Sequence, residues 1–372
     1  MLRRIGKVLI FLQLILLIQS VQDKCHILSL EGGGDKGAYQ AGVIWGLANS
    51  TKDVEWDVIS GISVGSINGI AISLFPKGQE KEATDLLINL WKGLRGYGDI
   101  FTSWSPNGVI QGLFSESGLF TTEPLSRILA NVMANRTIQR DFIIGATNVA
   151  TGSYDVFDYA NLNRSEYVDA ILSSAAFPLF FPNIKLRNNS YMDGGVKYSV
   201  DIPSAIQRCR DKGFSDDKIV IDSILCSESH IENVDASNYK SIDVLSRTIK
   251  LFMYNLKMSD LIEIGHIFPN VTLRYVIGPS KTLPDGMIPL DFNPTQIEQM
   301  ISIGISDAKT TVASKKGKTF EKLRKKYIMK KARIYLNKKD VTLEEAELMM
   351  NKIKEGKLRD YERMKKKFLG KY

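Results

Sequence analysis

The sequence predicts an α/β domain with a mainly parallel sheet, followed by a basic helical extension. Short apolar runs typical of buried strands alternate with segments of helical periodicity along most of the chain. No internal repeat or low-complexity linker divides it, and the composition changes only near Ala313, where Lys and Arg become frequent. With 372 residues, 44% hydrophobic and 24% charged, the chain can bury a sizeable core.

The strands are predicted from apolar runs bounded by turn residues. The first runs from Cys25 to Glu31 and meets a glycine stretch, and the second, Trp56–Ser60, runs into a turn of small residues. Further strands are predicted in DFIIGATNVATG, YMDGG, KIVIDSILC and NVTLRYVIGP. The regular alternation of such runs with helical segments indicates an α/β domain with a mainly parallel sheet.

Helices are predicted between these strands. AYQAGVIWGLA follows the first strand, and GISVGSINGIAISLF combines a turn with the start of a buried helix. EKEATDLLINLWKGL is amphipathic, TEPLSRILANVM has Thr122 as a candidate N-cap, and Pro178 stops the helix of VDAILSSAAFPLFFP. Residues 96–122, rich in Gly, Ser, Pro and aromatic residues, are predicted to form a long loop or cap.

Charge differs between the body and the C-terminal tail. Residues 315–372 hold 21 Lys/Arg and 8 Asp/Glu, a net charge of +13, whereas residues 1–314 carry −5. This asymmetry indicates either an anionic partner, membrane or nucleic acid, or simply a solvated charged helix. Thr342 and Glu345 form a T-x-x-E capping box that opens a basic amphipathic helix. Its apolar positions are Leu343, Ala346, Met350, Ile353, Tyr361, Met364 and Phe368.

The N-terminus has the pattern of a secretory signal peptide over residues 1–20. A basic start precedes an apolar run of 11 residues from Val8 to Ile18, and Ser20 offers a small residue for cleavage. This run is short for a transmembrane helix, which needs about 20 apolar residues. An uncleaved membrane anchor is the alternative to a signal peptide. A secreted or luminal protein agrees with five glycosylation sequons, at Asn49, Asn135, Asn163, Asn188 and Asn270.

Cysteine and histidine spacing predicts no metal site and no disulfide framework. The three cysteines are Cys25, Cys209 and Cys226, and a single Cys209–Cys226 bridge is possible in an oxidising compartment. We therefore expect no metal or cofactor.

The stretch LSLEGGGDKGAYQAG admits two interpretations. Gly32, Gly34 and Gly37 spell G-x-G-x-x-G, a dinucleotide-binding pattern. That pattern needs an acidic residue at the end of the second strand to hold the ribose. Asp57 is at about the right separation but starts that strand. The other interpretation is a glycine-rich turn at a helix N-terminus that holds a developing negative charge.

The end of the second strand carries G-x-S-x-G at Gly61, Ser63 and Gly65. In a strand–turn–helix context this pattern is typical of a nucleophile elbow, whose small neighbours let the serine hydroxyl project. The following helix directs its positive end at the serine. Taken alone, the same pattern can be a glycine-lined turn.

The glycine stretch would complement such a serine. Backbone amides of Gly32, Gly33 and Gly34 can approach the oxyanion of an acyl-transfer intermediate, and Lys36 adds positive charge nearby. The alternative is a structural strand-to-helix turn with an exposed lysine.

Ser63 also needs a base. A Ser…Asp…His triad leaves only His230 and His266 downstream, in segments without a glycine turn or strand end. Asp193 in YMDGGV is the stronger candidate, because it ends a strand and precedes two glycines. An aspartate can take the serine proton directly when its site tunes its pKa. The alternative is an ordinary turn aspartate, since Asp-Gly is a common turn dipeptide.

Three blocks, Gly32–Gly37, Gly61–Gly65 and Asp193–Gly195, together resemble the signature blocks of patatin-like phospholipases. GATNVATG and SSAAFPLFFP are similar to connecting segments of that family, and the resemblance covers residues 26–203. It implies a three-layer α/β/α sandwich and a Ser–Asp dyad, with Ser63 as nucleophile and Asp193 as base. The remaining positions that the resemblance carries over are Gly32, Gly33 and Gly34 as oxyanion hole, Lys36 as the basic residue, and Gly37, Gly61, Gly65, Gly194 and Gly195 as motif glycines.

Two positions depart from the family pattern. Glu31 replaces the commoner aspartate before the glycines, and VKYSVDIP, with Asp201 before its proline, replaces an Asn-x-Pro segment. Neither change touches the dyad.

The expectation is a secretory-pathway lipid acyl hydrolase that acts on a phospholipid or another acyl lipid. Its domain spans residues 24–312, and the tail, 313–372, would dock on an anionic membrane rather than on nucleic acid. Two alternatives stay open. One is an α/β-hydrolase-type serine esterase that uses His230 or His266, and the other is a non-enzymatic lipid or membrane binder.

Overall fold

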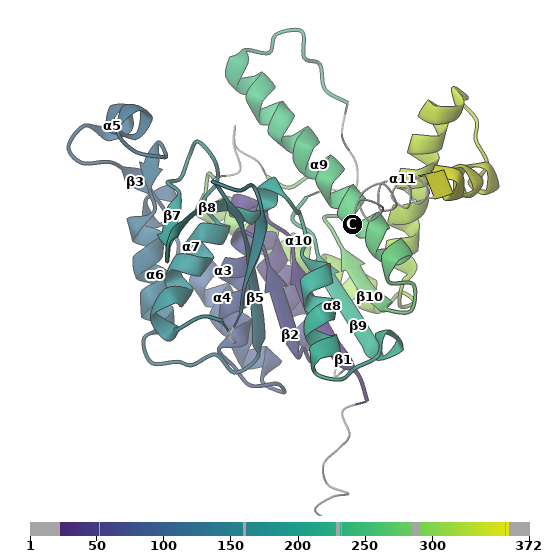
Figure 1. Ribbon diagram of the computed structural model, residues 1–372, viewed down its shortest axis with the longest axis horizontal. Coiled ribbons are helices and arrows are strands. Elements are labelled where there is room, and N and C mark those ends of the chain that lie inside the picture. Colours follow the sequence, from purple (N-terminus) through teal and green to yellow (C-terminus); the bar gives the residue numbers. More distant parts are fainter. Residues whose placement is uncertain are drawn as a thin grey trace, which may run out of the picture.

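An eight-stranded sheet forms the centre of the structure, a computed structural model that describes residues 23–51, 53–158, 161–227, 231, 233–284, 290–353 and 355–356 (Figure 1). Its strands are β1 (Cys25–Leu30), β2 (Val58–Gly61), β5 (Asp141–Asn148), β6 (Tyr154–Asp158), β7 (Ile184–Leu186), β8 (Asn189–Asp193), β9 (Ile219–Ile224) and β10 (Thr272–Ile277). They follow the order β10-β9-β1-β2-β5-β8-β7, and β6 pairs with β5. The predicted signal peptide, residues 1–20, lies outside the described residues.

The sheet is mainly parallel, as predicted. The five strands from β10 to β5 pair in parallel, whereas β6, β7 and β8 are antiparallel to their neighbours. Leu30 of β1 pairs with Gly61 of β2 on one side and with Ile224 of β9 on the other. The carboxyl ends of these strands therefore share one edge, which is where ligands bind in open α/β sheets.

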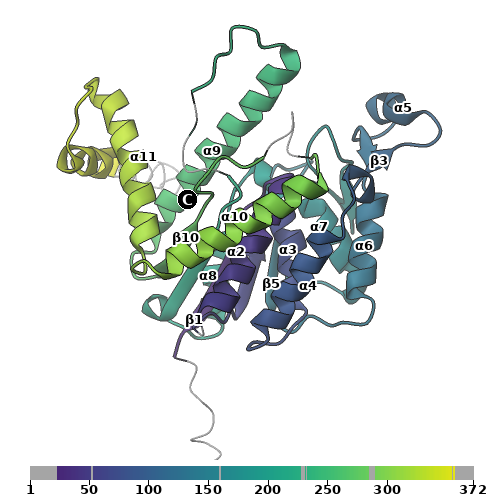
Figure 2. The ribbon, with the colours of Figure 1, turned by 180° about the vertical axis from the view of Figure 1, so that it is seen from behind.

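Helices cover one face of the sheet with closely packed backbones. They are α2 (Gly37–Ser50), α3 (Val64–Ser73), α4 (Glu80–Lys92) and α10 (Pro294–Val312), of which α2, α4 and α10 lie in front of the sheet in Figure 2. A Cβ atom added to Gly42 of α2 would lie 2.2 Å from the carbonyl oxygen of Ile301 in α10. Glycine at this position therefore lets the two helices touch backbone to backbone.

The opposite face is covered by α8 (Ile202–Asp211), α9 (Ser241–Ile267) and α11 (Lys318–Leu336). Successive side chains of a strand point to opposite faces, and the two cores follow this alternation. Ile27 packs with Met258 of α9 on this face, whereas Leu28 packs into the core on the α2 side. The three-layer α/β/α sandwich is thus confirmed, with α6 (Glu123–Met133) and α7 (Tyr167–Ser174) beside β5 and β7.

The basic tail begins with α11 and continues into a second helix over residues 343–353. The predicted capping box is present: the Glu345 amide donates to Thr342 Oγ1 at 3.1 Å, and the Thr342 amide donates to Glu345 Oε2 at 2.8 Å. The apolar stripe of this helix packs against the α8–α9 core rather than facing solvent. The packed members are Leu343, Ala346, Met350 and Ile353; Tyr361, Met364 and Phe368 lie outside the described residues.

The segment predicted to be a loop or cap contains a short helix and a small ribbon. The helix is α5 (Gly108–Phe114), and β3 (Thr102–Ser103) pairs with β4 (Phe120–Thr121) in a sheet of its own. Figure 1 shows α5 projecting from the body beyond α6. Thr122 occupies the N-cap position of α6, but its side chain makes no capping hydrogen bond.

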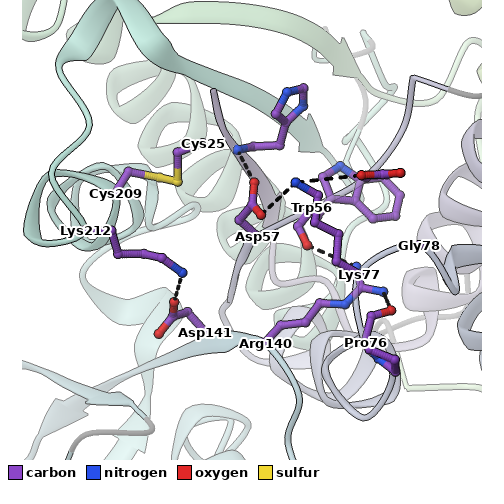
Figure 3. A network of polar contacts seen from close by, with 12 residues as sticks. Cys25, Trp56, Asp57, Pro76, Lys77, Gly78, Arg140, Asp141, Cys209 and Lys212 are labelled. Carbon is purple, nitrogen blue, oxygen red and sulfur yellow. Dashed lines mark hydrogen bonds and ion pairs between the residues drawn. A yellow bond between two sulfur atoms is a disulfide. The ribbon is translucent and has the colours of Figure 1, made fainter. Parts of the chain in front are cut away.

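Polar contacts close the amino edge of the sheet (Figure 3). The Asp57 carboxylate accepts a hydrogen bond from the His26 amide at 2.8 Å and pairs with Lys77 at 2.9 Å. The buried Arg140 guanidinium pairs with Glu80 at 2.6 Å and donates to backbone carbonyls, one of them that of Trp56. Asp57 therefore lies at the amino edge of the sheet, whereas a ribose-binding acid would lie at the carboxyl edge.

A disulfide links Cys25 to Cys209, with 5.9 Å between their Cα atoms (Figure 3). The Cys209–Cys226 pairing considered from the sequence is wrong. Cys209 lies in α8 beside the amino end of β1, whereas Cys226 follows β9 at the carboxyl edge. A six-residue strand spans about 20 Å, too far for a bridge. Cys226 is a buried free thiol.

Within the described residues, the helices lack an apolar stretch long enough to cross a bilayer.

Loss of the bridge is expected to destabilise the fold, because it removes a constraint between residues 184 positions apart. Cys25→Ala/Cys209→Ala should lower the free energy of unfolding by about 2–4 kcal/mol in urea under oxidising conditions. Alkylation of the denatured, unreduced wild type should label only Cys226. Labelling of Cys25 or Cys209 without reduction would contradict the bridge.

Candidate active site

A cavity of about 380 Å³ opens at the carboxyl edge of the sheet. Its floor holds the glycine stretch, Ser63 and Asp193, so the three predicted blocks meet in one place. Its walls are apolar side chains from α3, α4, α6 and α9 and from residues 177–181. Such a site suits a ligand with a long apolar part and one reactive polar group.

Ser63 occupies the sharp turn between β2 and α3. Its φ of 55° and ψ of −125° lie outside the regions that a serine normally adopts. The Ser63 amide donates to Ser174 Oγ at 2.9 Å, and its carbonyl accepts from Ser66 Oγ at 2.6 Å. These contacts hold the strained turn, and α3 directs its positive N-terminus at the serine.

The flanking glycines are required by close backbone contacts. A Cβ atom on Gly61 would lie 2.3 Å from the carbonyl oxygen of Gly65, and one on Gly65 would lie 2.4 Å from that of Leu30. Any larger residue would push the turn away from the end of β1. The G-x-S-x-G segment therefore has the tight strand–turn–helix backbone that a nucleophile elbow requires.

Asp193 ends β8 with its side chain buried on the cavity floor, and the residue is 4% exposed. Its Oδ1 accepts a hydrogen bond from the Gly195 amide at 2.7 Å. Burial raises the pKa of this carboxyl to about 7, although the nearby Ser63 hydroxyl and the Gly195 amide act to lower it. A carboxylate with this pKa is poised to exchange a proton near neutral pH.

Gly194, the first glycine of the Asp-Gly-Gly turn, explains why this turn can lie so close to the sheet. A Cβ atom on Gly194 would lie 2.4 Å from the carbonyl oxygen of Gly145 in β5. Asp193 itself is fixed through its backbone: its amide donates to the Ala176 carbonyl at 2.9 Å, and its carbonyl accepts from Thr147 Oγ1 at 3.1 Å. The turn is therefore held by β5 and by the segment after α7.

The glycine stretch packs directly against the elbow. A Cβ atom on Gly32 would lie 3.2 Å from Cβ of Ser63. The Gly32 amide donates to the carbonyl of Ser199 at 3.4 Å, so it is already used. Within the described part of the chain, the amides of Gly33 and Gly34 make no hydrogen bond. Of the three predicted oxyanion donors, these two are available to a ligand.

Lys36 and Gly37 lie just behind the site. Lys36 is the N-cap residue of α2, is partly exposed and is absent from the cavity lining. A Cβ atom on Gly37 would lie 2.3 Å from the Val64 side chain and 2.6 Å from the Trp91 ring. Gly37 thus has a packing role, and Lys36 lies outside the cavity lining.

Glu31 anchors the glycine stretch, a role that the sequence marked only as a departure from the family pattern. Its fully buried carboxylate accepts four hydrogen bonds. The donors are the Cys226 amide at 2.6 Å, the Ser227 amide at 3.1 Å, and the hydroxyls of Ser227 and Ser199, each at 2.8 Å. Because Glu31 directly precedes Gly32, these bonds fix the start of the glycine stretch.

Helix α9 supports the same region. Its Asp260 carboxylate accepts from the Ser199 amide at 2.6 Å, and burial raises the pKa of Asp260 to about 7. Lys257, buried in the same helix, donates to the carbonyl of Ser227 at 3.0 Å. The helix therefore anchors both loops that Glu31 joins. No sequence signal pointed to α9, since its residues carry no motif.

The triad alternative depends on His230 or His266. His230 lies outside the described residues, and His266 lies in the last turn of α9. Met253 of the same helix lines the cavity, and His266 follows it 13 positions later in the helix. That distance is about 20 Å along the helix axis.

Among the described residues, no group of three or more His, Cys, Asp and Glu side chains is placed to hold a metal ion.

Glu31 substitutions are expected to destabilise the fold, because buried donors would lose their acceptor. Glu31→Gln should lower the free energy of unfolding by about 1–3 kcal/mol. Glu31→Asp should also lower it, because the shorter side chain cannot reach both loops. Urea unfolding measures both, with the exposed Glu123→Gln as control. Wild-type stability in Glu31→Gln would refute the anchoring role.

The part of the chain that carries this site is similar to known proteins. A family model described as patatin-like phospholipase matches residues 28–206. The chain is 28% identical over 204 residues to Probable lipid hydrolase 463L of Invertebrate iridescent virus 6, which covers 51% of this chain and 67% of that protein. The crystal structure of VipD from Legionella pneumophila aligns with a TM-score of 0.42 at 11% identity, covering 79% of this chain and 67% of that one. The residues that match this family model include both Ser63 and Asp193.

Proposed function

We propose that the protein is a lipid acyl hydrolase of the phospholipase A type, which cleaves fatty-acyl esters with a Ser63–Asp193 dyad. One observation carries the proposal: a strained serine, a buried aspartate and two open glycine amides lie together at the floor of an apolar cavity. The relative named a probable lipid hydrolase supports the same substrate class.

The first half of the reaction forms an acyl-enzyme. Ser63 Oγ attacks the ester carbonyl while the Asp193 carboxylate takes the serine proton. The amides of Gly33 and Gly34 donate hydrogen bonds to the oxyanion of the tetrahedral intermediate. The intermediate then expels the alcohol, which leaves with the proton returned by Asp193.

The second half releases the fatty acid. A water molecule attacks the acyl-serine carbonyl while Asp193 again accepts a proton. The same two amides hold the second oxyanion. Collapse breaks the bond to Ser63 Oγ, which regains its proton from Asp193, and the dyad is restored.

The apolar walls suit the acyl chain of such a substrate. Leu87 and Trp91 of α4 and Leu129 of α6 line the cavity beyond the dyad. An acyl chain among them would leave water, which is favourable for each methylene buried. The walls also exclude water from around Asp193, and this desolvation is what raises its pKa.

The tail and the cell compartment belong to the proposal as well. Exposed lysines of α11, including Lys322, Lys325 and Lys326, would attract an anionic membrane. A secreted or luminal location is supported by the Cys25–Cys209 bridge and by the exposure of the asparagines in the five sequons.

Loss of either dyad member is expected to abolish catalysis. Ser63→Ala and Asp193→Asn should each lower fatty-acid release from phospholipid by a factor on the order of 10³ or more. His230→Asn and His266→Asn should keep wild-type rates, because the proposed mechanism uses no histidine. Product analysis by mass spectrometry measures all four. Full activity in Asp193→Asn, or its loss in one histidine variant, would favour the triad alternative.

The pH dependence should report the ionisation of Asp193. Only the carboxylate can accept the serine proton, and its pKa is about 7. The value of kcat/KM should therefore rise with pH, by about tenfold per unit below pH 7, and level off above it. A soluble ester substrate separates this effect from lipid packing. A rate independent of pH between 5 and 8 would contradict Asp193 as the base.

A further inference from the structure

Large apolar side chains are exposed on two projections that flank the cavity. On α5, Ile110 is 70% and Phe114 80% exposed, and Leu113 is also exposed. On α9, Leu245 and Phe252 are exposed. Leu179, a residue of the cavity wall that lies between α5 and α9 in the sequence, is exposed as well. We call these six residues the apolar rim. Soluble proteins rarely present such side chains together without a binding role.

The two projections extend on the same side of the molecule. Figures 1 and 2 both show α5 and the N-terminal part of α9 rising beyond the body, on the side opposite to the amino end of β1. That side is the carboxyl edge of the sheet, where Ser63 lies. The rim therefore surrounds the direction from which a substrate would enter.

The rim is continuous with the cavity. Leu179, Leu245 and Phe252 are exposed to solvent and also line the cavity wall. The same side chains thus meet both the occupant of the cavity and whatever lies outside its mouth. A lipid bilayer can supply apolar groups both inside the cavity and at the surface around its mouth, so it can contact these side chains in both places.

The α5 projection is built to hold its apolar residues outward. The Trp104 indole donates to the Gly118 carbonyl at 2.9 Å, and a Cβ atom on Gly112 would lie 2.5 Å from the Leu119 carbonyl oxygen. These contacts join the residue after β3 to the segment before β4 and bring α5 close to that segment. The exposure of Ile110 and Phe114 therefore belongs to the folded arrangement.

Charge also favours a neutral lipid surface for this projection. Residues 96–122 contain no Lys or Arg, and Asp99 and Glu116 are their only charged residues. Attraction to anionic headgroups would need basic residues there. Insertion of apolar side chains among lipid headgroups needs none.

We propose that the apolar rim seats the cavity mouth on a lipid bilayer by apolar insertion, independently of the basic tail. The proposal deepens the proposed function and rests on it for the identity of the substrate. A bilayer lipid can then pass from the membrane into the cavity without exposing its acyl chain to water. The tail adds attraction to anionic lipid, whereas the rim acts on zwitterionic lipid as well.

Vesicle binding by the full chain tests the proposal. Binding is measured by co-sedimentation with phosphatidylcholine vesicles, in a Ser63→Ala background so that lipid is not consumed. Ile110→Ser/Phe114→Ser should weaken binding by tenfold or more, because two large apolar groups no longer leave water. Ile267→Ser, at the far end of α9, is the matched control and should bind normally.

The second readout is enzyme activity, which is measured in protein that keeps Ser63. Ile110→Ser/Phe114→Ser should lower hydrolysis of vesicle phospholipid by a similar factor and leave hydrolysis of a soluble short-chain ester unchanged, since neither residue lines the cavity. Lys322→Gln/Lys326→Gln should weaken binding only when vesicles contain phosphatidylserine.

Two results would overturn the proposal that the apolar rim binds the bilayer. One is unchanged phosphatidylcholine binding in Ile110→Ser/Phe114→Ser, and the other is wild-type binding that requires phosphatidylserine and is lost in the lysine variant. Vesicle binding could fall as expected in Ile110→Ser/Phe114→Ser while protein that keeps Ser63 hydrolyses no ester. In that case the proposed function fails and the docking surface stands.

Discussion

The contact between Gly65 and the carbonyl of Leu30 is the constraint on which the site depends. It leaves no room for a Cβ atom and therefore presses the Ser63 turn against the end of β1. The glycine stretch begins at that end, so its open amides and the serine hydroxyl share one cavity. Glu31 holds the same stretch from behind by linking it to the loop after β9 and to Ser199. The parallel register of β9, β1 and β2 is what brings these loops to one edge.

Burial connects catalysis with substrate choice. The apolar walls that would receive an acyl chain are the same walls that keep water from Asp193 and raise its pKa to about 7. In the proposed mechanism a base of that pKa takes the place of a histidine, because a carboxyl with this pKa can both take and return a proton near neutral pH. The walls then continue onto the surface as the apolar rim. One physical property, low polarity, thus links the base, the acyl site and the approach to the membrane.

The fold class and the meeting of the three motif blocks were predicted from the sequence, whereas several contacts around them were not. Ser63, Asp193 and their glycines belong to short motifs, in which the glycines themselves indicate tight turns. The structure brings these motifs together. Helix α9 escaped prediction because its apolar residues divide between cavity, core and solvent, which blurs a single helical stripe: Ile249 lines the cavity, Met258 is in the core and Leu251 is exposed. The disulfide pairing and the role of Glu31 depend on contacts between residues more than 160 positions apart. Such contacts follow from the sheet order, which no local pattern specifies.

The central claim is that Ser63 is a nucleophile activated by its surroundings, and labelling with a fluorophosphonate tests it most directly. The folded protein should gain one phosphonyl group, located by peptide mass spectrometry on Ser63. Asp193→Asn should label far more slowly, and the urea-unfolded chain should not label. Absence of an adduct on the folded protein, or an adduct on a different residue while lipid hydrolysis continues, would contradict the account.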